Sequence, residues 1–140
     1  VSKRDIEHVT VAGRQVAVSK DVTDQERTLI KEAIQATRPS EKACFVNALE
    51  MWQYNTRFKY VEGFAVMTEF GTGGTAHAWC LLDSEKLVDV TKPFDHYYGV
   101  LISEPEILDR YTGSNLTANG ILGNHHDRYE FLRERGYMDD

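Results

Sequence analysis

The chain has 140 residues and a formal charge of −6, and hydrophobic residues make up 41% of it. This length suffices for one domain with a single core and is too short for two ordinary domains. The acidic balance argues against nucleic acid or an anionic membrane as a partner, because both attract basic proteins. No apolar run approaches the roughly 18–20 residues that are needed to cross a bilayer.

The sequence gives no sign of export. Its first ten residues, VSKRDIEHVT, include basic residues but no apolar segment behind them, so we see no signal peptide. The two cysteines lie in unlike settings and do not suggest a disulfide framework. We therefore expect the protein to work in a reducing cytoplasm.

Residues 1–40 predict a hairpin followed by a helix. Residues 8–19 alternate and are rich in valine, and an Ala-Gly pair at their centre supplies a turn. Residues 24–37 place apolar side chains on one helical stripe, which Thr23 or Asp24 can cap. The following Arg-Pro-Ser ends this helix, and Ser40 can cap the next one.

The rest of the chain predicts a second helix and a run of strands. The helix is expected from about residue 41 to 55, and the strands at 59–69, 76–82, 86–91 and 97–103. The tail is more polar, with a helix expected over residues 126–135. These elements predict an α+β domain with an antiparallel sheet and helices against one face. This single domain is expected to consist of an N-terminal hairpin and helix over residues 1–40, a core over 41–103 and a polar extension over 104–140.

A thiol nucleophile, a base and an acid follow one another along this core. Cys44 is expected in the first turn of the second helix, where free backbone N–H groups and the helix dipole favour an anion. The same N–H groups can bind the oxyanion of a tetrahedral intermediate, and Asn47, one turn later, could add a side-chain donor.

His77 and Asp89 are expected on two paired strands. Both lie six residues from Asp83, the centre of the predicted hairpin, so they should be close cross-strand neighbours on one face. We expect Asp89 to accept the Nδ1 proton of His77 and to leave Nε2 free to act on the thiol. Cys44, His77 and Asp89 together predict acyl-transfer chemistry through a thioester.

The motifs around these residues resemble a known group. Cys44 on a helix, YVEGFA at 60–65, HAW at 77–79 and DVT at 89–91 resemble the transglutaminase-like branch of the papain-like cysteine enzymes. With KACFVNA, LVDVT and YYGV, the chain is also similar to small uncharacterised bacterial and phage proteins. The resemblance implies a papain-like core with Cys44 as nucleophile, His77 as base and Asp89 as orienting acid. The chain departs from the family pattern at Lys42, usually glycine, and at Val61, usually cysteine.

Three further residues are candidates for substrate binding, each with a structural alternative. Trp79 shares a strand face with His77 and could cover the site or serve as a core aromatic. Glu62 could bind an amine of the substrate or pair with an arginine of the chain. Tyr98 could join a rim formed by residues 94–98, or pack within a strand.

Other chemistries fit the sequence less well. A zinc site from Cys44, His77 and Cys80 lacks a C-x-x-C pair and a fourth ligand, and strand alternation separates its last two members. The adjacent histidines at 125–126 are better explained as a solvated helix start. The FGTGGT run lacks the lysine and helix of a phosphate loop; it is a strand connection that could also gate the site. We expect neither a metal nor a cofactor.

Two functions follow from these predictions. The first is a cysteine hydrolase or acyltransferase, namely a protease, amidase or transglutaminase-like enzyme, that acts on a peptide, protein or small amide substrate. The second is an inactive binding module of the same fold, such as a phage protein that engages a host factor. The sequence does not indicate the oligomeric state.

Overall fold

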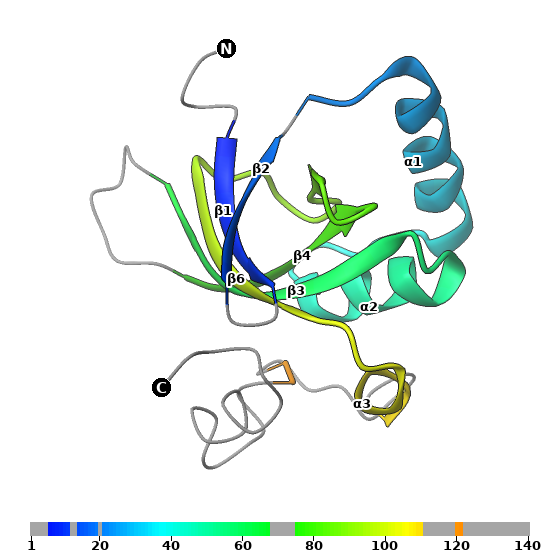
Figure 1. The fold of residues 1–140 in the computed structure, drawn as a ribbon. Coiled ribbons are helices and arrows are strands. Elements are labelled where there is room, and N and C mark those ends of the chain that lie inside the picture. The colour runs from blue at the N-terminus through cyan, green and yellow to red at the C-terminus, as the bar shows by residue number, and fades with distance from the viewer. Residues whose placement is uncertain (1–5, 12–13, 20, 68–74, 111–119, 122–140) are drawn as a thin grey trace.

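The structure is a computed structural model, and it describes residues 6–11, 14–19, 21–67, 75–110 and 120–121 (Figure 1). The predicted α+β class is confirmed, because four of its strands form an antiparallel sheet and three helices are present in the described ranges. None of these helices has the length and apolar character needed to span a membrane. The elements are β1 (Ile6–Val11), β2 (Arg14–Ser19), α1 (Asp24–Thr37), α2 (Cys44–Tyr54), β3 (Phe58–Val66), β4 (Thr75–Leu82), β5 (Lys86–Val88), β6 (His96–Ile102) and α3 (Pro105–Arg110).

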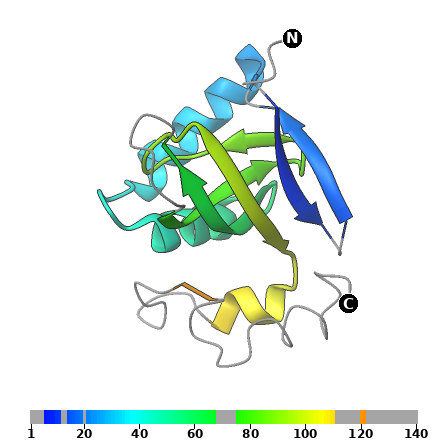
Figure 2. The same cartoon turned by 90° about the vertical axis from the view of Figure 1, so that its left-hand side faces the viewer.

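The sheet is strongly curved and closes on itself. Strands β5, β4, β3 and β6 are antiparallel neighbours in that order. The antiparallel hairpin of β1 and β2 joins both ends, because β2 pairs with β5 and β1 pairs with β6, each in parallel. Figure 2 shows this hairpin alongside β6. The predicted first hairpin is therefore part of the same sheet as the core strands.

The helices cover the outer face of β3 and β4. Helix α2 packs against both strands, and α1 packs against α2. One apolar cluster lies between α2 and this face and includes Phe45, Met51 and Tyr60. A second cluster fills the inside of the curve and includes Trp79 and Tyr97. The alternation of β4 sends His77 and Trp79 inward and Ala78 and Cys80 outward.

Several predicted boundaries change in the structure. The second helix begins at Cys44 rather than near residue 41, and Ser40 does not cap it. Strand β5 ends at Val88, three residues earlier than predicted. Helix α3 was not predicted, although a proline at its first position is typical of a helix start. The predicted turn at 12–13, the connection at 71–74, the histidines at 125–126 and the helix at 126–135 lie outside the described residues.

Two glycines, one in the YVEGFA motif and one in the YYGV motif, make room for neighbouring backbone and for the inner aromatic residues. Gly63 on β3 lies opposite both His77 and Gly99. A Cβ at Gly63 would overlap the carbonyl oxygen of Tyr98, and one at Gly99 would lie 2.7 Å from the ring of Trp79. The close approach of β3 to β6, and the position of Trp79 beside His77, therefore both require glycine.

Candidate active site

Cys44 is the first residue of α2, as its proposed chemistry requires. Its side chain is buried, with a relative exposure of 9%. Thr23 caps α1 through a complete capping box, whereas at Ala43, the N-cap of α2, the described part of the chain provides no side-chain hydrogen bond. The backbone N–H groups of the first turn of α2 are therefore left for an anion beside the thiol.

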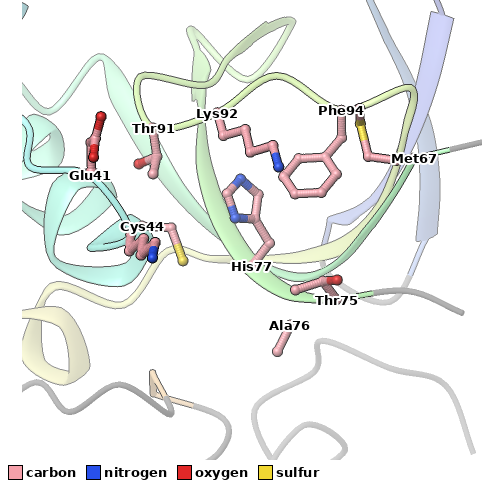
Figure 3. Close-up of a pocket in the computed structure, with 10 residues that line it drawn as sticks. Glu41, Cys44, Met67, Thr75, Ala76, His77, Thr91, Lys92 and Phe94 are labelled. Atoms are coloured by element: carbon pink, nitrogen blue, oxygen red, sulfur yellow. The ribbon is translucent and has the colours of Figure 1, made fainter. Parts of the chain in front are cut away.

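His77 and Asp89 form a buried pair. The Nε2 atom of His77 lies 2.7 Å from Oδ2 of Asp89, and the two side chains are 5% and 4% exposed. The choice of nitrogen corrects the sequence prediction, because Nε2 rather than Nδ1 faces the carboxylate. Nδ1 is therefore the nitrogen left for Cys44, and Figure 3 shows it on the side of the ring that faces the sulfur.

The register of the hairpin explains how this pair forms. Asp83 and Ser84 both have a positive φ, and Leu82 lies opposite Lys86. The position facing Asp89 is therefore that of Trp79, so Asp89 and His77 are close cross-strand neighbours, as predicted, but are not directly opposite each other. His77 lies two residues farther along β4, on the same face, so the carboxylate reaches it diagonally.

Asp89 is held in place by four hydrogen bonds. Besides His77, its Oδ2 accepts a hydrogen bond of 2.8 Å from Oη of Tyr97. Its Oδ1 accepts hydrogen bonds from the backbone N–H groups of Thr91 and Lys92, at 3.0 and 3.2 Å. The tyrosine hydroxyl also accepts a hydrogen bond of 2.8 Å from the N–H of Phe94. The segment that follows β5 therefore folds around the carboxylate and fixes its direction.

The surroundings favour the protonated form of His77. Burial alone would lower its pKa, but hydrogen bonds with Asp89 and Cys44 and the negative charges of both groups raise that pKa to about 9. At neutral pH the ring is therefore an imidazolium, placed between a carboxylate and a sulfur. Such a cation stabilises a neighbouring thiolate.

Aromatic rings enclose this imidazole. The ring of Phe94 lies 4.8 Å from it, centroid to centroid, and that of Trp79 lies 6.0 Å away in a stacked orientation. Trp79 is 1% exposed, and its Nε1 has no hydrogen-bond partner among the described residues. Trp79 is therefore a core residue that packs beside the imidazole of His77. Phe94, in contrast, lines the pocket.

A pocket of about 640 Å³ opens over Cys44 and His77 (Figure 3). Its walls combine apolar side chains with charged and hydroxyl-bearing ones. They are formed by Glu41, Lys42, Cys44, Met67, Thr75, Ala76, His77, Thr91, Lys92 and Phe94. The thiol and the imidazole are therefore both accessible from one cavity that has room for part of a substrate.

Asn47 has a structural role instead of the predicted donor role. Its Oδ1 accepts a hydrogen bond of 3.0 Å from the N–H of Ser40, and its Nδ2 donates to the carbonyl of Ser40 and to Oγ1 of Thr91, at 2.8 and 2.7 Å. Both amide protons are thus used within the protein. Asn47 fixes the loop before α2 and ties the helix to the segment that follows Asp89.

Glu62 and Tyr98 lie away from the pocket. Glu62 is buried on the outer face of β3, where its Oε1 accepts hydrogen bonds from Oη of Tyr60, at 2.5 Å, and from the N–H of Ile121, at 2.7 Å. Tyr98 points outward on β6 and is 57% exposed, beside Phe64 on the neighbouring strand. Neither contributes to the lining, so the predicted substrate-binding roles of both residues are not supported by their positions.

Cys80 has the core position that strand alternation predicts. Its thiol donates a hydrogen bond of 3.4 Å to the carbonyl of Ala48 in α2, and burial raises its pKa well above the usual range. It points to the opposite face of β4 from His77. Within the described ranges, no group of three or more His, Cys, Asp or Glu side chains has an arrangement that could hold a metal ion.

Sequence reasoning missed two contributions from the segment after Asp89, those of Lys92 and of the Tyr97 hydroxyl, whereas Phe94 lies in the rim predicted over residues 94–98. Lys92 and Phe94 line the pocket, and Tyr97 rather than Tyr98 supports the carboxylate. The available signal was the sequence VTKPFDHYY directly after Asp89, because its proline disfavours a continued strand and its aromatic residues lie close enough in the chain to fold back over the carboxylate.

Comparisons of the chain with protein-family models, with curated protein sequences and with solved structures found no match.

Proposed function

We propose that the protein is a cysteine-dependent hydrolase or acyltransferase that acts on an amide or other acyl bond through a thioester. The observation that supports this proposal best is the buried His77–Asp89 pair, which shares one pocket with Cys44 at the start of α2. In this proposal the curved sheet and α2 form a transglutaminase-like variant of the papain-like core. The order of the three residues, their elements and the motifs around them support that assignment.

The first half of the reaction uses the ion pair. The Cys44 thiolate attacks the acyl carbon, so a C–S bond forms and the carbonyl electrons move onto oxygen. The backbone N–H groups at the start of α2 can donate to this oxyanion. As the intermediate collapses, the bond to the leaving amine breaks, and the His77 imidazolium gives that amine its Nδ1 proton.

The second half releases the acyl group. Neutral His77 takes a proton from water or from an acceptor amine, which attacks the thioester carbon. The C–S bond then breaks, and the thiolate and imidazolium are restored. Asp89 keeps its hydrogen bond to Nε2 throughout and stabilises the cationic ring each time it forms.

The buried network favours catalysis over the alternative of a binding module without turnover. Burying a charged pair costs desolvation free energy, and such a pair is weak support for stability on its own. A surface that only binds a partner would need neither a buried carboxylate and imidazole nor a thiol that shares their pocket. We therefore place the binding module second.

Alkylation with iodoacetamide at pH 7 tests this proposal in the folded protein. We expect Cys44 to react at least tenfold faster than Cys80, because only Cys44 has the imidazolium and the open pocket. The substitution His77→Ala should slow Cys44 by about tenfold or more and leave Cys80 unchanged. Site-resolved mass spectrometry measures both rates.

Cys80 is the internal control, since its exposure would rise if a variant unfolded. Equal and slow labelling of the two cysteines, unaffected by His77→Ala, would contradict the enzymatic proposal and leave the binding module as the better account.

A further inference from the structure

We propose that the acyl substrate carries a single carboxylate, which Lys92 and Lys42 bind at the rim of the pocket. This inference rests on the proposed function and names a substrate class for the same site. It comes from the charges that surround Cys44 and His77.

Lys92 is positioned by the catalytic network itself. Its backbone N–H donates to Oδ1 of Asp89, and its Nζ lies over the ring of Phe94, 5.5 Å from the centroid. That ring is the one that lies 4.8 Å from His77. The ammonium is therefore held beside the imidazole, at the open side of the pocket (Figure 3).

Lys42 brings a second ammonium to the pocket from the loop before α2. It lies two residues before Cys44 and has a φ of 62°, a conformation that favours glycine. The chain keeps a long basic side chain at this strained position on the pocket wall. A functional use for the charge would explain why the strain is tolerated.

The charge balance of the lining points to a monoanion. The His77 imidazolium is paired with the buried carboxylate of Asp89, so the other charged side chains of the lining are two lysines and Glu41, which carry one net positive charge. Among the residues that the structure describes, neither lysine forms an ion pair. This local balance is opposite in sign to the charge of −6 on the whole chain, so it would concentrate a carboxylate at the pocket.

The lining also fits the carbon chain of such a substrate. Met67, Ala76 and Phe94 supply apolar surface next to the sulfur and the imidazole. An amide or ester whose acyl half ends in a carboxylate would place its chain on these residues and its charge near the lysines.

Alkylation of Cys44 by two matched reagents tests the inference. Iodoacetate is an anion and iodoacetamide is neutral, yet both form the same type of S–C bond and release iodide. We expect the ratio of the iodoacetate rate to the iodoacetamide rate to fall about threefold in Lys92→Met, the effect of one unit charge several ångströms away at a protein surface. Lys42→Met should lower it by a similar factor.

Lys31→Met is the matched control, because Lys31 is an exposed residue of α1 and does not line the pocket. It makes the same change in net charge and should leave the ratio unchanged. Because each iodoacetate rate is divided by the iodoacetamide rate of the same variant, a change in the reactivity of the thiol itself cancels in the ratio. The attraction of His77 for iodoacetate is common to all variants and cancels in the comparison.

The outcomes separate this inference from the proposed function. If Cys44 reacts with both reagents in a His77-dependent way but the ratio is the same in Lys92→Met, Lys42→Met and Lys31→Met, the carboxylate inference is overturned and the thiol chemistry stands. If neither reagent depends on His77, the proposed function itself fails and takes this inference with it.

Discussion

Asp89 links the proposed catalytic groups to the surrounding fold. Its Oδ2 accepts hydrogen bonds from His77 and Tyr97, and its Oδ1 accepts two from backbone N–H groups. A carboxylate held in this way keeps one orientation, so the imidazole that it contacts keeps one as well. Tyr97 does not line the pocket, and its contribution is therefore to position Asp89.

The substitution Tyr97→Phe should weaken this arrangement without creating a large cavity. We expect the free energy of unfolding to fall by about 1 kcal/mol, because the hydroxyl bonds both Asp89 and the N–H of Phe94. Alkylation of Cys44 should slow by severalfold and its pH profile should change, because a less firmly held Asp89 positions His77 less well. Denaturant unfolding and alkylation across pH measure these effects.

Tyr98→Phe is the neighbouring control, because that hydroxyl lies on the exposed outer face of β6. This substitution should alter neither the free energy of unfolding nor the rate of Cys44 alkylation. If both substitutions behaved alike, the assigned role of Tyr97 would be wrong.

At the scale of elements, the site depends on where α2 begins. Asn47 bonds both the N–H and the carbonyl of Ser40, and it reaches across to Thr91. These bonds hold the preceding loop against the helix, so the chain turns through the positive φ of Lys42 and the helix starts at Cys44. The thiol thereby lies at the first turn instead of inside the helix.

Asn47→Ala should therefore disturb both stability and reactivity. Removing three partly buried hydrogen bonds and leaving their partners unpaired should cost about 2–3 kcal/mol of unfolding free energy. Cys44 should also lose part of its selective reactivity as the start of α2 shifts or frays. Thermal unfolding and the ratio of Cys44 to Cys80 alkylation report the two effects.

Asn55→Ala tests the other end of the same helix, where the side chain makes one exposed hydrogen bond to the N–H of Arg57. We expect Asn55→Ala to lower the free energy of unfolding by about 0.5 kcal/mol and to leave the ratio of Cys44 to Cys80 alkylation unchanged. A comparable loss of selectivity in both variants would contradict the role given to Asn47.

The sequence predicted the strands and both long helices because each has a local signal. Valine alternation marks β1 and β2, and the Thr23 cap marks α1. It did not predict the start of α2, because the bonds from Asn47 to Ser40 link positions seven residues apart and replace the expected Ser40 cap. It also missed the hairpin register, which the positive φ values at Asp83 and Ser84 determine.

At the scale of the whole molecule, the sheet closes through contacts that local patterns do not encode. The first hairpin joins β5 and β6 by parallel pairs between segments more than 60 residues apart. Alternation predicts which residues of a strand share a face but not which distant strand will pair with it. This closure encloses Trp79 and Tyr97 in the inner cluster, and these residues support His77 and Asp89.

The triad could be predicted as a set of residues but not in its atomic arrangement. Cys44, His77 and Asp89 come together because strand alternation and the short β4–β5 connection keep the last two on one face. The ring nitrogen that faces the carboxylate depends on the diagonal register and on the Tyr97 contact. Both of these arise only in the folded chain.

An NMR titration of the His77 ring nitrogens tests the central claim most directly, with His77→Gln identifying its signals among the five histidines. The structure predicts that His77 titrates with a pKa of about 9, because Asp89 and Cys44 both favour the cation. In Cys44→Ala the pKa of His77 should fall, since the sulfur no longer stabilises the protonated ring. A ring that titrates near 6.5 and does not respond to Cys44→Ala would contradict the account.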